Sequence, residues 1–263
     1  MHTPVLLKEV IEGLRVVPDG LYIDGTYGEG GHAQAIALKG GKVLGIDLDD
    51  AQVVKSTQGS IRVVQGNYAE IVQIARKEEF FPVDGVLLDF GLSMEQLSHS
   101  NRGFSFKHGE EPLDMRIDDT STDQTAADVV NSYSRQELTE IFSRNAEQLG
   151  GQKLANAIKS GGKVTTVADV VDRIGSESES TLKRVFQALR IEVNHEFENI
   201  KAGIEGAYEI TKDGGRIVII SFHSVEDRIV KQWARQKGLK EIMKQKGGTQ
   251  AFERSAVLRI YQK

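Results

Sequence analysis

Cysteine is absent from this 263-residue chain, which excludes disulfides, thiolate nucleophiles and cysteine zinc ligands. The chain also lacks any apolar run near the roughly 18 residues that span a bilayer. Its first residues lack the basic-then-apolar pattern of a secretion signal. We therefore expect a cytoplasmic protein without a membrane partner, whose oligomeric state the sequence leaves open.

Positive charge is in short supply, because 33 Lys and Arg face 38 Asp and Glu, for a net charge of -5. Lys and Arg make the phosphate contacts that dominate binding to nucleic acids, so the overall charge argues against an RNA partner. The stretch Arg228 to Lys246 is the exception, with Glu241 as its single acid. It predicts either a solvated helix face or a phosphate contact. Its basic residues are Arg228, Lys231, Arg235, Lys237, Lys240, Lys244 and Lys246.

Glycine is plentiful in one loop, D-G-T-Y-G-E-G-G-H from Asp24 to His32, between a strand-like and a helix-like run. Glycine lets backbone N–H groups approach a ligand, and the helix N-terminus that follows adds partial positive charge. A dinucleotide-binding turn would cradle a pyrophosphate, but the carboxylate of Asp24 would repel it. A cationic ligand fits better. We expect S-adenosylmethionine, which carries an ammonium and a sulfonium, with Asp47 placed to accept its ribose hydroxyls.

Strand-like and helix-like runs alternate in the first 90 residues, which predicts an α/β fold with a doubly wound, mostly parallel sheet. An amphipathic helix with Pro4 in its first position comes before them. Because ligands bind at the carboxyl ends of such strands, Asp24, Asp47 and Asp89 should meet at one edge. The expected strands are Leu21–Ile23, Lys42–Asp47, Ile61–Gln65 and Val83–Asp89, with helices near Ala33–Leu38, Asp50–Thr57 and Tyr68–Glu78 between them.

The alternation stops after Asp89, and the next strand expected is Arg216–Ile220. The intervening residues predict helices: capping patterns begin at Ser134 and Thr166, and apolar residues repeat at helical spacing from Leu182 to Tyr208. A helix over Val225–Lys237 and a strand over Ala256–Tyr261 should complete the sheet domain. We predict a methyltransferase-type domain from residues 1–98 and 205–263, and an inserted helical region for substrate recognition at 99–204.

Motifs spread over nearly the whole chain resemble the bacterial 16S ribosomal RNA (cytosine-N4)-methyltransferase family. They are His2-Thr-Pro-Val-Leu-Leu7, the loop Asp24 to His32, Leu87-Leu-Asp-Phe-Gly91, Arg102-Gly-Phe-Ser-Phe106, Pro112-Leu-Asp-Met-Arg116, Phe186-Gln-Ala-Leu-Arg-Ile191 and Ile220-Ser-Phe-His-Ser-Val-Glu-Asp-Arg228.

The resemblance implies an S-adenosylmethionine-dependent methyltransferase fold. It implies that the acceptor is N4 of a cytidine in the decoding region of 16S ribosomal RNA. We expect this RNA as the partner within the assembled small subunit, and the sequence leaves naked RNA open as the alternative substrate. Asp89-Phe-Gly-Leu-Ser-Met-Glu-Gln96 departs from the family's usual sequence at Leu92–Glu95, beside the transferred methyl group. The family's cofactor contacts fall here on Gly30, Gly31, His32, Asp47, Tyr68, Asp89 and Gln96.

The exocyclic amine of cytosine is a poor nucleophile that must lose a proton, so the site needs a hydrogen-bond acceptor. The first candidate is Asp89 or a nearby backbone carbonyl, although we expect Asp89 to serve mainly the donor. His223 is the second candidate, although a histidine at a strand end is often structural. The acids show no compact ligand spacing, so we expect no metal. Aromatic rings that stack a flipped base and cations that bind phosphate are expected after the fourth strand, with insertion core as the alternative for the rings. These candidates are Arg102, Phe104, Phe106 and Arg116.

Two other functions remain open at this stage. A ribosome- or RNA-binding protein could keep the fold without turnover, which the altered loop Leu92–Glu95 favours. A nicotinamide-dependent oxidoreductase would share the sheet, but Asp24 before the glycines disfavours it.

Overall fold

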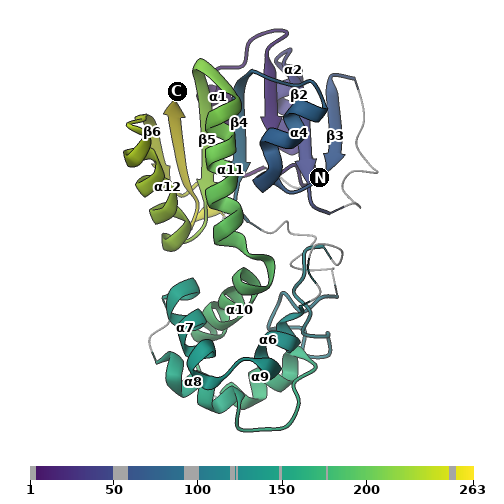
Figure 1. The fold of residues 1–263 in the computed structure, drawn as a ribbon, viewed down its shortest axis with the longest axis vertical. Coiled ribbons are helices and arrows are strands. Elements are labelled where there is room, and N and C mark those ends of the chain that lie inside the picture. Colours follow the sequence, from purple (N-terminus) through teal and green to yellow (C-terminus); the bar gives the residue numbers. More distant parts are fainter. Residues whose placement is uncertain are drawn as a thin grey trace. The chain divides into compact units, whose positions relative to one another are not determined.

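A computed structural model describes residues 4–49, 59–91, 101–118, 122, 124–147, 150–175, 177–248 and 253–263. The chain forms two compact units (Figure 1). The first joins Met1–Gly91 to Phe197–Lys263, and the second is Leu92–Glu196. No helix among the described residues is long and apolar enough to cross a membrane.

The first unit is built on a seven-stranded sheet in the order β3-β2-β1-β4-β5-β7-β6. Neighbouring strands from β3 to β5 are parallel, and β7 is antiparallel to both of its neighbours. This confirms the doubly wound, mostly parallel α/β fold. The strands are β1 (Leu21–Asp24), β2 (Lys42–Asp47), β3 (Ile61–Gln65), β4 (Val83–Asp89), β5 (Thr211–Ser221), β6 (Lys240–Lys246) and β7 (Val257–Gln262).

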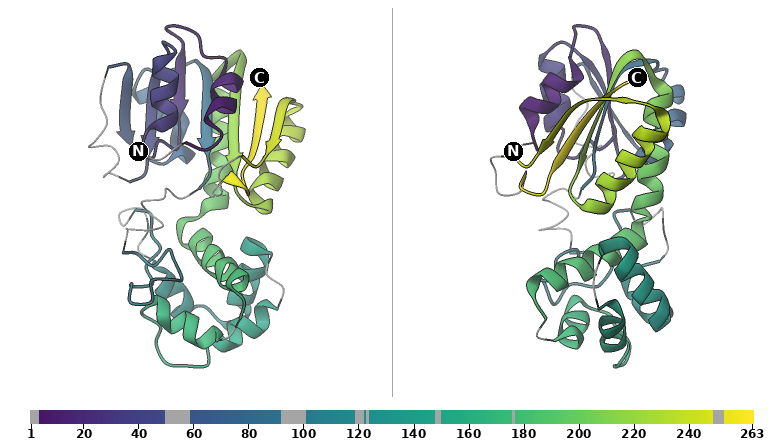
Figure 2. Two further views of the ribbon diagram at one scale, coloured as in Figure 1. Left: turned by 180° about the vertical axis from the view of Figure 1, so that it is seen from behind. Right: turned by 90° about the vertical axis from the view of Figure 1, so that its left-hand side faces the viewer.

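Helices cover both faces of this sheet, as the edge-on view in Figure 2 shows. On one face, α1 (Leu7–Leu14) and α2 (Gly31–Leu38) contribute to a core cluster with residues of the strands. The other helices of the unit are η1 (Tyr68–Glu70), α4 (Ile71–Lys77), α11 (Glu196–Ile210) and α12 (Ser224–Lys237). Trp233 of α12 packs edge-on against both Tyr208 of α11 and Tyr261 of β7.

Three features of this unit differ from the sequence prediction. Helix α1 begins at Leu7 and not at Pro4, because Leu6 has a left-handed backbone (φ 51°) that a helix cannot include. The stretch Lys240–Lys246 is the edge strand β6, although its charges suggested a continued helix face. Strand β5 begins at Thr211, before its predicted start. The predicted helix Asp50–Thr57 lies outside the described residues.

The second unit is helical and has its own apolar core, which extends from Phe104 to Val193. Capping boxes at Ser134 and Thr166 open α7 and α9, as their sequence patterns predict. A third capping box, at Thr125, opens a helix that the sequence analysis missed. The helices are α6 (Ala126–Ser132), α7 (Arg135–Ala146), α8 (Gly151–Ile158), α9 (Val167–Ile174) and α10 (Glu179–Asn194).

The long helix predicted from Leu182 to Tyr208 is two helices, α10 and α11. His195 between them has a left-handed backbone (φ 50°), which ends α10. The apolar spacing continues through both helices, so the pattern alone could not show the break. The units divide between Glu196 and Phe197, whereas the expected boundary at 204/205 lies inside α11. The other expected boundary, at 98/99, falls outside the described residues.

Candidate functional site

Three carboxylates end three neighbouring strands of the first unit. Strand β1 ends in Asp24 and lies between β2, which ends in Asp47, and β4, which ends in Asp89. Because the three strands are parallel, the carboxylates lie at the same edge of the sheet, where ligands of doubly wound folds bind.

The glycine-rich loop is anchored to the end of β2 by Asp47. Its Oδ2 accepts the Gly28 N–H at 2.6 Å, and its Oδ1 accepts the Asp49 N–H at 2.9 Å. Burial raises the pKa of Asp47, although these backbone hydrogen bonds oppose the shift. Gly28 (φ 52°) and Gly30 (φ 76°) have left-handed backbones, and a Cβ on Gly30 would overlap the Tyr27 ring. The loop therefore needs glycine at both positions.

The same loop is tied to the end of β4. Gly25 N–H donates to the Leu87 carbonyl at 2.9 Å, and Asp89 N–H donates to Thr26 Oγ1 at 2.7 Å. The sequence analysis did not single out Thr26, although its place beside Asp24 in the loop was a usable signal. These bonds hold the ends of β1 and β4 and the start of the loop together.

Asp24, Asp89 and His32 form a buried polar cluster that is incompletely hydrogen-bonded. Asp24 Oδ2, Asp89 Oδ1 and both ring nitrogens of His32 are buried without a hydrogen-bond partner in the part of the chain that the structure describes. His32 Nε2 lies 3.8 Å from Asp89 Oδ2. Buried polar groups are normally satisfied, so this cluster can accept a polar or cationic ligand.

Burial dominates the electrostatics of the cluster. It raises the pKa of Asp24 to about 7, with a further contribution from Asp47. It raises the pKa of Asp89 to about 8, with contributions from Asp24 and Glu226. Burial also lowers the pKa of His32 to about 4, so the imidazole is neutral at pH 7. A bound cation would stabilise the ionised carboxylates and oppose both upward shifts.

We expect the free chain to lose stability as pH rises from 7 to 9. An unfolded aspartate has a pKa near 3.9, so between that value and about 7 to 8 the folded chain binds more protons through Asp24 and Asp89 than the unfolded chain does. Stability from these groups is therefore full below pH 4, falls as pH rises above that value, and is fully lost once pH has passed 7 and 8, so the range from pH 7 to 9 contains the last part of the loss. His32 changes stability only between about pH 4 and 6.5, where it makes stability rise with pH. Thermal unfolding at pH 7, 8 and 9 measures the effect.

Asp89→Asn is the informative variant for this prediction, because its amide stays neutral throughout. Its midpoint temperature should fall less than that of the parent chain between pH 7 and 9. Asp19→Asn, which changes an exposed acid of the same unit, should behave as the parent does. Equal slopes for the parent and Asp89→Asn would contradict the prediction.

Tyr68, the expected aromatic contact, lies beside the loop. Its ring centroid is 5.8 Å from that of Phe90. A Cβ on Gly203 of α11 would come within 2.4 Å of the Tyr68 ring, and a Cβ on Gly25 would come within 3.3 Å of its Cβ. The glycines let α11 and the loop pack closely around this tyrosine.

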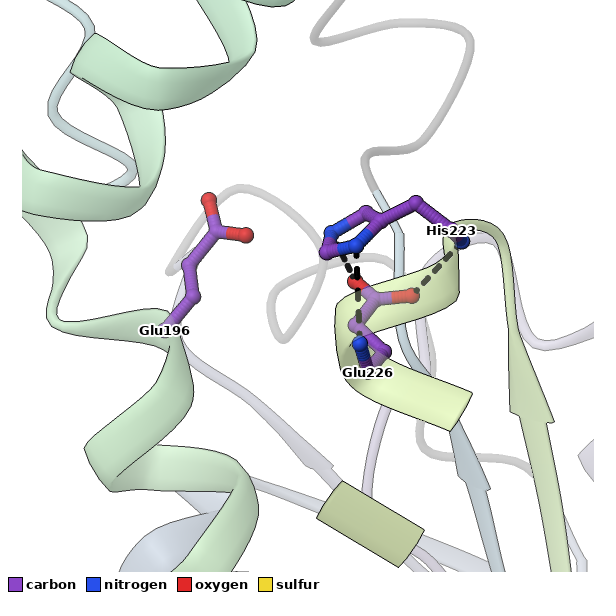
Figure 3. A group of neighbouring side chains, drawn as sticks. All are labelled: Glu196, His223 and Glu226. Carbon is purple, nitrogen blue, oxygen red and sulfur yellow. Dashed lines mark hydrogen bonds and ion pairs between the residues drawn. The ribbon is translucent and has the colours of Figure 1, made fainter. Parts of the chain in front are cut away.

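His223 caps the N-terminus of α12 (Figure 3). Its Nδ1 accepts the Glu226 N–H at 3.5 Å, and its Nε2 lies 2.9 Å from Glu226 Oε1 at a poor hydrogen-bond angle. In return, Glu226 Oε2 accepts the N–H groups of Phe222 and His223. This geometry supports the structural reading of His223. It also brings in Glu226, which the sequence analysis missed despite the i, i+3 spacing of a capping box.

The expected RNA-contacting residues of the second unit are engaged within that unit. Phe104 is buried in its core, and the half-buried Phe106 packs edge-on against Phe186. Arg102 donates to the Arg116 and Ile117 carbonyls. Arg116 binds both carboxylate oxygens of Asp114, at 2.8 and 2.9 Å. In this structure the two arginines organise the segment, and Phe104 matches the alternative of insertion core.

Gln96 and the altered loop Leu92–Glu95 lie outside the described residues. Every other residue predicted to contact the cofactor is in the first unit. Gly30 caps α2, Gly31 and His32 begin it, Asp47 and Asp89 end strands, and Tyr68 begins η1.

A doubly wound sheet with a glycine-rich loop and acids at its carboxyl edge is the architecture of α/β proteins that bind ligands containing a nucleoside. The MraW methylase family matches residues 1–258, and the chain belongs to this family. This confirms the resemblance read from the motifs and makes the oxidoreductase alternative untenable.

Relatives with similar sequences carry the name ribosomal RNA small subunit methyltransferase H. The protein from Dehalococcoides mccartyi is 39% identical, over 90% of this chain and 71% of its own. The protein from Thermomicrobium roseum is 40% identical, over 90% and 77%. The protein from Coprothermobacter proteolyticus is 39% identical, over 100% and 96%.

Proposed function

We propose that this chain transfers a methyl group from S-adenosylmethionine to N4 of a cytidine in the decoding region of 16S ribosomal RNA. The observation that carries the proposal is the buried cluster of Asp24, Asp89 and His32, with its unsatisfied polar atoms, in a chain of the MraW methylase family. The relatives named as small-subunit ribosomal RNA methyltransferases support this RNA as the acceptor molecule.

The residues of the first unit fit the donor. Asp24 and Asp89 supply negative charge for its cationic end, and the loop before α2 brings backbone N–H groups to its carboxylate. Asp47 accepts from the ribose hydroxyls, and Tyr68 contacts the adenine. When bound, the donor supplies an electrophilic methyl group. Gly30, Gly31, His32, Asp47, Tyr68, Asp89 and Gln96 are the proposed contacts.

The acceptor side requires removal of one N–H proton as the nitrogen forms its new bond to carbon. Ionised Asp89 can accept a hydrogen bond from the amine. In the chain without ligand, burial raises the pKa of this carboxyl group to about 8, which favours acceptance of a proton, and the bound cation of the donor opposes that shift. We assign to Asp89 the main role of binding the donor. We assign to the same carboxylate the hydrogen bond with the N–H group of the acceptor amine. His223 is a weaker candidate, because its ring faces Glu226.

We assign substrate recognition to the second unit, which has a core of its own and contains Arg102, Phe104, Phe106 and Arg116. Phe104 contributes to recognition indirectly, by packing in the core of this unit. Arg102 and Arg116 contribute by holding the shape of the segment that contains them. We propose the assembled small subunit as the substrate, and therefore the cytoplasm as the place of action.

The test is transfer of labelled methyl from S-adenosylmethionine to small ribosomal subunits that lack the modification, followed by nucleoside analysis. We expect N4-methylated cytidine as the labelled product, and no label in subunits that already carry the modification. Donor binding without methyl transfer to the small subunits would favour the RNA-binding alternative. Label in another nucleoside would overturn the assignment of the acceptor atom.

A further inference from the structure

Strand β6 and the end of α12 carry an excess of positive charge. Residues 228–246 have seven basic residues and one acid, for a charge of +6, whereas the whole chain has -5 and the remaining residues therefore -11. Strand β6 is the outer strand of the sheet and pairs only with β7. Figure 1 shows β6 and α12 on the same side of the sheet, at its outer strand.

Acidic residues near these two elements are paired with basic side chains of the same unit. Arg259 of β7 is buried, and its guanidinium binds both Asp227 of α12 and Glu241 of β6. Lys231 pairs with Asp227 at 3.3 Å, and Lys237 pairs with Glu205. The negative charges of α12 and β6 are thus already engaged.

Four exposed cations remain, and none forms an ion pair with the residues that the structure describes: Arg235, Lys240, Lys244 and Lys246, which we call the basic edge. Lys244 and Lys246 lie opposite Arg259 and Val257 of β7, so their side chains are on the face of the sheet that α12 covers. Lys246 lies at the carboxyl end of the sheet, because its partner Val257 also pairs with Ser221 at the end of β5.

We propose that the basic edge binds the phosphate backbone of the RNA substrate. The inference rests on the proposed function, because it assigns that substrate a second contact surface. Lysines on an edge strand also prevent pairing with other chains. That role needs no cation on α12, and it does not need the neighbouring acids to be paired within the fold. An acidic protein needs a local positive surface to approach RNA, and charge complementarity selects phosphate as the occupant.

The structure revises which residues of this stretch matter. The sequence shows seven basic residues from Arg228 to Lys246, but in the structure Lys231 and Lys237 are paired within the fold. If Lys231 and Lys237 bound phosphate, they would have to break their ion pairs with Asp227 and Glu205. The dependence of binding on salt should therefore come mainly from the basic edge.

The experiment compares two double variants with the same change in charge. The test variant is Lys244→Ala with Lys246→Ala. The control is Lys39→Ala with Lys77→Ala, two exposed lysines of the first unit that have no ion pair among the described residues. Binding to small ribosomal subunits that lack the modification is measured between about 50 and 200 mM salt, together with donor affinity.

The test variant should flatten the slope of log affinity against log salt by about 1.4 to 1.8, at roughly 0.7 to 0.9 per lost phosphate contact. The control should keep the parent slope, and Lys244→Arg with Lys246→Arg should keep most of it. All variants should bind the donor as the parent does. Equal slopes in the test and control variants would overturn the basic edge alone. Absence of both subunit binding and methyl transfer in the parent chain would instead overturn the proposed function.

Discussion

A chain in which residues 101–195 are replaced by a short flexible linker is expected to bind S-adenosylmethionine but to transfer no methyl group to RNA. The described donor residues all lie in the first unit, and the linker leaves Gln96 in place. The removed residues include the described core of the second unit from Phe104 to Val193, so the helices of that unit are removed together with the residues that they pack against. We expect donor affinity within about tenfold of the parent.

Two measurements make this deletion interpretable. Calorimetry gives donor affinity, and a donor-dependent rise in the unfolding temperature shows that the shortened chain is folded. Methyl transfer to unmodified small subunits should then be below detection, because the second unit is proposed to recognise the RNA. Transfer at the parent rate would show that substrate recognition lies in the sheet unit. Loss of donor binding in a folded chain would show that the second unit helps to form the donor site.

Asp47→Ala should weaken S-adenosylmethionine binding by about 1–3 kcal/mol, or roughly 5- to 150-fold. The carboxylate of Asp47 is proposed to accept from the ribose hydroxyls, and in the structure it already accepts the Gly28 N–H at 2.6 Å. The substitution therefore removes a ligand contact and a loop anchor together. Calorimetry measures the loss, with Asp19→Ala as a control that removes an exposed acid from the same unit.

A ligand comparison separates the two roles of Asp47. The parent should bind S-adenosylhomocysteine more tightly than its analogue without the ribose hydroxyls, and Asp47→Ala should lose most of that preference. A loop defect alone would weaken both ligands equally and keep the preference. Unchanged donor affinity in a folded Asp47→Ala chain would remove Asp47 from the site.

The first half of the sheet was predictable because its strands are apolar runs with clear ends. Strands β2, β3 and β4 have the bounds that the sequence predicted. The apolar runs of β2 and β4 are buried over most of their length, and a strand of this kind can be predicted without knowledge of distant partners. The capping boxes at Ser134 and Thr166 were predictable for the same reason, since each is a local pattern of four residues.

Strand β6 could not be predicted in this way. Its residues are mostly exposed and charged, and they form a strand only because β7 offers hydrogen bonds along one side. The break at His195 was hidden as well, since one left-handed residue leaves the apolar spacing of α10 and α11 intact. In both cases the deciding interaction or backbone angle leaves no trace in local composition.

The sequence by itself determined the sheet class, the glycine-rich loop, the acids at the strand ends and membership of a methyltransferase family, because each rests on residue type and short-range order. Only the tertiary structure decided which of those groups are available. It showed that Asp24, Asp89 and His32 have buried polar atoms without hydrogen-bond partners among the described residues, and that His223 caps a helix. It also showed which basic residues are paired and which have no ion pair in the described part of the chain. Burial and pairing depend on residues far apart in the chain, and these set both the charge of an ionisable group and its freedom to bind a ligand.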